Sequence, residues 1–250
     1  MNAEKTYLLF KTVAGLPEVH FLQCERYLYG FLLCLSLIIP TSIGAQPAAG
    51  YQDFPAIQAL FETGKTDTFI KQDIWISNVG EGFRRGTQVA SISAGAAYGV
   101  LIFGGEERHH LSLISASYGQ MIGGVQGMDK WYRGNWEIRA EIFGGAQFNS
   151  ETRGLVGITP HIRYHFATGS RLIPYFDLGA GLSLTEIRGP DLGGAFEFNL
   201  QAVTGFNYFI KDNLSINIAM QYLHLSSASI CMPNNGVNTV GCFLGVQWFF

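Results

Sequence analysis

The stretch NLSINIAMQYLHLS, residues 213–226, decides the fold because apolar and polar side chains alternate along it. Its even positions are apolar and its odd positions are mostly polar, as in Leu214, Ile216 and Ile218 against Ser215 and Asn217. Successive side chains of a β-strand point to opposite faces of the sheet. In a membrane barrel the apolar face meets lipid and the polar face lines the lumen. The stretch therefore predicts one spanning strand with its even positions outward.

Working outward from this strand, seven further segments carry a similar pattern, the first two less cleanly than the rest. The predicted strands are 87–103, 108–120, 133–147, 154–166, 172–187, 195–209, 213–226 and 237–250. Lipid offers backbone groups no hydrogen-bond partner, so only helices and closed barrels span a membrane. No segment after the N-terminal region is long and apolar enough for a spanning helix. The sequence therefore predicts an all-β, eight-stranded antiparallel transmembrane β-barrel over residues 87–250.

The composition agrees with this class. Charged residues make up 14% of the 250-residue chain, whereas soluble domains carry about 25%. The formal net charge of −3 leaves no basic footprint, so we expect no nucleic-acid partner.

The N-terminal region resembles an export signal. Arg26 precedes the apolar run LYGFLLCLSLII, residues 28–39, and the small residues IGA end at position 45. A charge, a short apolar core and small residues define a secretory signal peptide. We therefore expect a signal peptide over 1–45, with an unusually long start. Residues 46–86 do not alternate convincingly, and we expect an N-terminal periplasmic segment or a plug there.

Charged side chains fall on the inward face of several predicted strands. An eight-stranded barrel is filled by side chains, and buried charges must be paired. We therefore interpret these residues as a paired internal network rather than as catalytic or transport groups: Glu137, Arg139, Glu141, His161, Arg163, His165, Asp177 and Glu197.

The chain ends and loops set the expected orientation. With the N-terminus in the periplasm, the loops near 104–109, 148–153, 188–194 and 227–236 face outward from the cell. The terminal aromatic Phe250 resembles the signal that the barrel assembly machinery recognises during insertion.

His224 and Ser226 continue the even series of the strand at 213–226, so both should lie on the lipid-facing wall near its outer rim. An imidazole that takes the proton of a neighbouring hydroxyl turns that hydroxyl into a nucleophile, and a third group orients the imidazole. Asn238 has the same outward parity, and antiparallel pairing across the loop could place it beside His224. From spacing alone, an interfacial pair that contacts lipid headgroups is the more probable interpretation.

The stretch HLSSASICMPNNGVN, residues 224–238, resembles the C-terminal signature of the lipid A 3-O-deacylase (PagL-like) family, also called acyloxyacyl hydrolases. The segments PYFDLGAGL (174–182) and FNYFIKDNLSINIAMQYLH (206–224) extend the resemblance. It implies an eight-stranded outer-membrane enzyme in which His224 is the base, Ser226 the nucleophile and Asn234 an oxyanion-hole residue. Two positions depart from the family pattern: Asn238 stands where a Glu completes the triad, and Ser227 where an Asn usually follows the nucleophile.

Together these features predict a serine esterase of the bacterial outer membrane that removes an ester-linked acyl chain from lipid A. Lipopolysaccharide is the expected substrate and the membrane lipids are neighbours; a homodimer is consistent with the sequence. We expect no cofactor and no metal. His109 and His110 are adjacent and better explained as loop residues than as ligands. The alternatives are a structural or adhesive barrel without chemistry, motivated by Asn238, and a small-solute channel.

Overall fold

The computed structural model describes residues 82–128 and 130–250. The predicted signal peptide over 1–45 and residues 46–81 of the expected periplasmic segment lie outside this part of the chain. Within it, no helix has the length and apolar character needed to cross a membrane.

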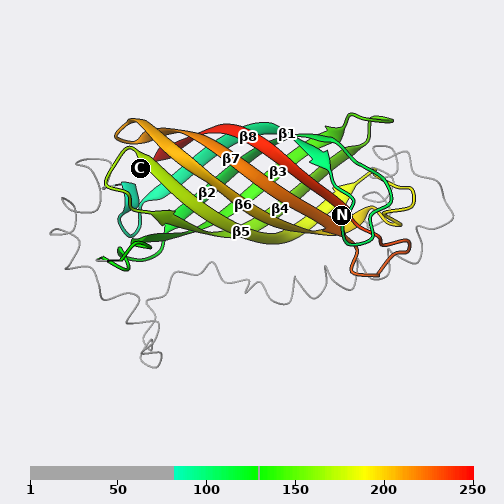
Figure 1. Cartoon of the computed structure of the whole chain (residues 1–250), viewed down its shortest axis with the longest axis horizontal. Coiled ribbons are helices and arrows are strands. Elements are labelled where there is room, and N and C mark those ends of the chain that lie inside the picture. Colours follow the sequence, from blue (N-terminus) through cyan, green and yellow to red (C-terminus); the bar gives the residue numbers. More distant parts are fainter. Residues whose placement is uncertain (1–81, 129) are drawn as a thin grey trace, which may run out of the picture.

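Eight antiparallel strands pair in sequence order, and β1 also pairs with β8, so the sheet closes into a barrel (Figure 1). Closure leaves no unpaired edge, which is the condition for a sheet to span lipid. The predicted fold class is thus confirmed. The strands are β1 (Gln88–Gly99), β2 (Leu111–Met121), β3 (Gly134–Gln147), β4 (Gly154–Phe166), β5 (Leu172–Thr185), β6 (Phe196–Lys211), β7 (Leu214–Ser226) and β8 (Val237–Phe249).

The first strand is shorter than its sequence pattern indicated. The apolar run continues to residue 103, but β1 ends at Gly99. Phe103 and Gly104 have φ angles of 53° and 98°, in the left-handed region that a strand does not use. Residues 100–105 instead turn back toward β8, where the Val100 amide donates to the carbonyl oxygen of Asn238, at 2.9 Å.

The inside–outside alternation of β7 follows the expected parity. Ile218 and Met220 are 44% and 54% exposed, whereas Ser215 and Asn217 are buried. The even face of β7 is therefore the outer wall.

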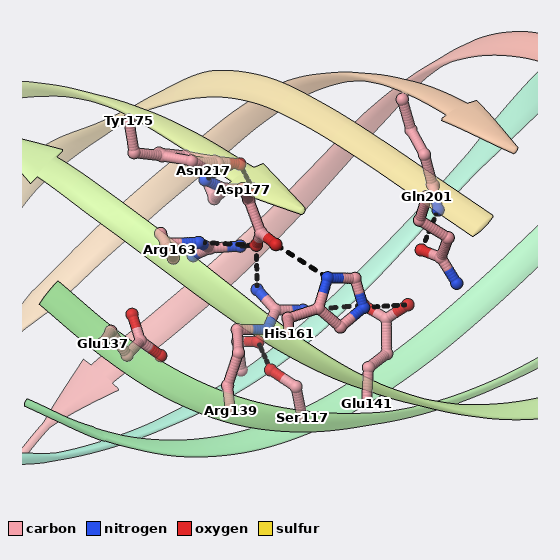
Figure 2. Close-up of polar contacts among 12 residues, drawn as sticks. Ser117, Glu137, Arg139, Glu141, His161, Arg163, Tyr175, Asp177, Gln201 and Asn217 are labelled. Carbon is pink, nitrogen blue, oxygen red and sulfur yellow. Dashed lines mark hydrogen bonds and ion pairs between the residues drawn. The ribbon is translucent and has the colours of Figure 1, made fainter. Parts of the chain in front are cut away.

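The lumen holds a network of ion pairs (Figure 2). The Asp177 carboxylate accepts from His161 Nδ1 at 2.7 Å and from Arg163 Nη2 at 2.7 Å. Arg139 Nη2 donates to Glu141 at 2.7 Å, while its Nη1 lies 3.5 Å from Asp177. Nearer the end of the barrel at which the chain terminates, His165 Nε2 lies 2.7 Å from Glu137 Oε2. Seven of the eight inward charges are therefore paired as the sequence predicted.

Glu197 is the exception, and its assignment to the paired network is wrong. Both of its carboxylate oxygens are buried, and neither has a hydrogen-bond partner among the residues that the structure describes. In the strand register Glu197 faces Ser183, and the neighbouring cation Arg188 donates to the carbonyl oxygens of Thr185 and Ile187 instead. Parity placed Glu197 in the lumen correctly but carried no information about its partners.

The two ends of the barrel differ. One end, here called the loop end, carries the loops 100–110, 148–153, 186–195 and 227–236; the chain terminates at the other (Figure 1). At the chain-terminus end, Phe83 is buried and its ring packs on those of His165, Phe209 and Phe249. Phe83, Phe209 and Phe249 thus belong to one buried apolar cluster at that end.

Candidate functional site

The outer wall at the loop end brings His224 and Asn238 together. The register of β7 and β8 places the two residues directly opposite each other. His224 Nδ1 lies 2.8 Å from Asn238 Oδ1, and because a carbonyl oxygen only accepts, the imidazole donates. In the neutral imidazole, the other ring nitrogen, Nε2, then carries a lone pair. This is the state in which an imidazole can take a proton.

Ser226 lies two residues beyond His224 on the same outward face of β7 and is half-buried. In the described part of the chain its hydroxyl makes no hydrogen bond with His224. Nucleophile–base hydrogen bonds are often long in substrate-free sites and tighten when substrate binds. The structure thus places the expected nucleophile and base on one face without joining them.

Asn234, the expected oxyanion residue, is hydrogen-bonded to Ser227. Its Oδ1 accepts from the Ser227 backbone amide at 2.7 Å and lies 3.0 Å from the Ser227 hydroxyl. These contacts turn the carboxamide nitrogen of Asn234 away from Ser227. The Ser227 amide is occupied by this bond, so it is not available as an oxyanion donor in this structure.

A buried carboxylate, Asp191, fixes the loops around the site and was not found from the sequence. Its carboxylate accepts from the backbone amides of Glu106 and Glu107, at 2.7 and 2.9 Å, and lies 3.0 Å from His109 Nε2. Its carbonyl oxygen accepts from the amides of Asn235 and Gly236. One residue therefore links three loops of the loop end, and it gives His109 a structural role.

Gly236 packs against His224 and has a φ of 82°. A Cβ atom at this position would lie 2.8 Å from His224 Cε1. We expect Gly236→Ala to push the imidazole out of place and lower any His224-dependent turnover by about ten- to a hundredfold, since misplacements near 1 Å have effects of this size. The prediction is checked by comparing the hydrolysis rates of the purified wild type and Gly236→Ala.

Gly86→Ala is the matched control, because Gly86 has a φ of 89° and its Cβ would meet no atom within 4 Å. Both variants carry the same type of backbone strain, and only one touches His224. Equal rates in the two variants would contradict a role for the packing of Gly236 on His224.

The closed barrel and the outward histidine–amide pair define a class: an outer-membrane barrel with a polar site on its lipid-facing wall. The family model described as lipid A 3-O-deacylase (PagL) matches residues 114–247, more than half of the chain. The chain belongs to this family, and the protein resides in the bacterial outer membrane.

Several solved structures are similar to this chain. The outer membrane enzyme PagL is 15% identical over 62% of this chain and 97% of its own, with a TM-score of 0.47. Neisserial surface protein A is 20% identical over 66% of this chain and 97% of its own, with a TM-score of 0.46. Ail, the attachment invasion locus protein of Yersinia pestis, is 14% identical over 67% of this chain and 100% of its own, with a TM-score of 0.44. No curated protein sequence gives a significant match.

Proposed function

We propose that the protein is an esterase that removes an ester-linked acyl chain from lipid A by a serine mechanism on its outer wall. Ser226 is the nucleophile, His224 the base, Asn238 the group that orients the base, and Asn234 an oxyanion donor. The observation that carries the proposal is the hydrogen bond from His224 Nδ1 to Asn238 Oδ1, on the face that Ser226 shares.

The proposed reaction proceeds in two halves. Ser226 Oγ attacks the ester carbonyl carbon while His224 Nε2 takes the hydroxyl proton. Asn234 Nδ2 donates to the oxyanion, a contact often worth about 3 kcal/mol in the transition state. The intermediate then expels the sugar hydroxyl, which receives the proton from His224. Water, activated by the same imidazole, cleaves the acyl-enzyme, releases the fatty acid and regenerates the Ser226 hydroxyl.

The outer wall beside Ser226 suits an acyl chain. The strand register continues from Ser226 through Phe198, Leu182 and Ile158, one outward apolar residue on each of β6, β5 and β4. Each successive residue lies further from the loop end of its strand. At about 4.8 Å between strands, the row extends about 14 Å across the outer wall from the nucleophile. The ester of an amphiphile can therefore reach Ser226 while its chain stays in an apolar environment.

The proposal is tested with purified, refolded barrel mixed with lipopolysaccharide, with and without divalent ions. Mass spectrometry of the lipid A should show the loss of one ester-linked acyl chain, and the free fatty acid should appear in parallel. Unchanged lipid A in the presence of a barrel shown to be folded would contradict the proposal.

The two other candidate functions fit the structure less well. A barrel without chemistry gives no reason for a buried carboxamide that binds the imidazole on the lipid-facing wall. A solute channel needs a bore, whereas the lumen is filled by buried side chains and has a cavity of about 30 Å³ beside Arg139 and Gln247. Such a volume holds about two water molecules. Insertion by the barrel assembly machinery and a homodimer stay predictions.

A further inference from the structure

The carboxamide of Asn238 is held from both of its ends. Its Oδ1 accepts from the Tyr222 hydroxyl at 2.6 Å as well as from His224 Nδ1. Its Nδ2 donates to the carbonyl oxygen of Ile102 at 2.9 Å. Only 4% of Asn238 is exposed, although it lies on the outward face of β8. The turn at residues 100–105 covers it.

The same turn is anchored to the residue that it covers. The Val100 amide donates to the backbone carbonyl oxygen of Asn238, and the Ile102 carbonyl oxygen also accepts from the Gly105 amide at 3.2 Å. The carbonyl of Ile102 is therefore fixed in space by backbone bonds on both sides. It offers an acceptor, and never a donor, to the side chain at position 238.

This arrangement permits one orientation of the amide. If the carboxamide were turned over, Oδ1 would face the Ile102 carbonyl oxygen, and two acceptors would meet. The Tyr222 hydroxyl can donate or accept, so it holds the amide in place while the Ile102 carbonyl sets its orientation. The observed orientation keeps the proton of His224 on Nδ1. When an asparagine replaces the acid of a serine triad in another enzyme, rate falls by about 10⁴ because the imidazole adopts the wrong tautomer. The contacts around Asn238 exclude that outcome here.

We infer that Tyr222 and the backbone carbonyl of Ile102 are positioning groups that let a neutral asparagine serve as the third member of the site. The inference rests on the proposed function for its kinetic consequences, but the orientation itself is a property of the resting protein. It also means that the site is built for an amide at position 238. A carboxylate there would bring a negative oxygen against the Ile102 carbonyl oxygen.

Tyr222→Phe removes the hydrogen bond from the Tyr222 hydroxyl to Asn238 Oδ1 and keeps the one from Asn238 Nδ2 to the Ile102 carbonyl oxygen. We expect kcat for fatty acid release to fall about two- to tenfold, the range for a lost hydrogen bond, with KM unchanged. Tyr98→Phe is the matched control. Tyr98 and Tyr222 both pair with Val240 in the strand register, one on each side of β8, so the two tyrosines lie in the same outward row. The Tyr98 ring packs on His110 and Phe148 rather than on the site. Equal kcat values in the two variants would overturn the role of Tyr222.

Asn238→Asp separates orientation from charge, since the two side chains have the same length. If charge at this position were what the site lacks, the variant would be faster than the wild type. We expect it to be slower, because the added negative charge faces the Ile102 carbonyl oxygen. A gain in kcat would overturn the inference.

The tautomer of His224 gives a readout that does not depend on turnover. Nitrogen-15 NMR of the imidazoles, with His224→Gln to identify the signal, should show the proton on Nδ1 in the wild type and also in Tyr222→Phe, where the Ile102 carbonyl still orients the amide. A proton on Nε2 in the wild type would overturn the inference. The expected tautomers in a protein that leaves lipid A intact would support the inference and refute the proposed function.

Discussion

Ser226→Ala is expected to abolish measurable release of fatty acid from lipopolysaccharide, a loss of at least about a hundredfold. Without the hydroxyl no acyl-enzyme forms, so the imidazole has no nucleophile to activate. Loss of the serine in an enzyme with a full triad costs about 10⁶ in kcat. A site with a neutral third residue starts from a lower rate, and the measurable loss is correspondingly smaller.

The barrel itself should not change in this variant. Ser226 lies at the end of β7 on the outer wall, and the described structure assigns its hydroxyl no hydrogen bond that the fold would lose. Ser112→Ala is the matched control, because Ser112 is an exposed outward serine at the loop end of β2. Folding is followed by the mobility shift of heated and unheated barrel in a gel, and turnover by mass spectrometry. Similar turnover in the two variants would exclude Ser226 as the nucleophile.

The alternation of side chains was sufficient to predict how the site is assembled. Once β7 and β8 are antiparallel strands joined by the loop 227–236, parity alone puts His224 and Asn238 on one face, and the register pairs them. Tyr222 could also have been found, because it precedes His224 by two residues in the same even series. Its role is not indicated by the sequence, because a tyrosine near the rim of a barrel is commonly explained by the membrane interface.

The groups that orient the site could not be predicted in this way. Ile102 and Asp191 lie in loops, far along the chain from Asn238 and Gly236, and no periodicity links them. The apolar run after Gly99 even argued for a longer strand, since hydrophobicity does not reveal the positive φ angles at Phe103 and Gly104. The position of a backbone carbonyl, such as that of Ile102, cannot be predicted from the pattern of side chains in the sequence. Loop conformation therefore decides a property that strand patterns do not encode, namely which way the Asn238 amide faces.

The second large effect concerns stability, and it comes from the lumen. Asp177→Ala is expected to lower the free energy of unfolding by about 3–5 kcal/mol, the range for breaking a buried ion pair from one side. The Asp177 carboxylate is fully buried, and it faces Arg163, His161 and Arg139. After its removal, Arg139 keeps its ion pair with Glu141. The Arg163 guanidinium loses the carboxylate that lies 2.7 Å from it. Denaturant titrations of the barrel in lipid vesicles, followed by tryptophan fluorescence, measure the change.

A double-mutant cycle distinguishes lost charge pairing from lost packing. Arg163→Met in the Asp177→Ala background removes the cation that the first substitution left unpaired, so the double variant should be more stable than Asp177→Ala alone. Leu178→Ala is the matched control at the next position of β5, which faces the outer wall. The Leu178 side chain is 47% exposed, so the substitution should lower the free energy of unfolding by less than about 2 kcal/mol. Additive effects of the Asp177 and Arg163 substitutions would show that the two residues do not stabilise the barrel as a pair. Because Asp177 points into the lumen and His224 lies on the outer wall, the folded fraction of Asp177→Ala should keep the wild-type rate per molecule.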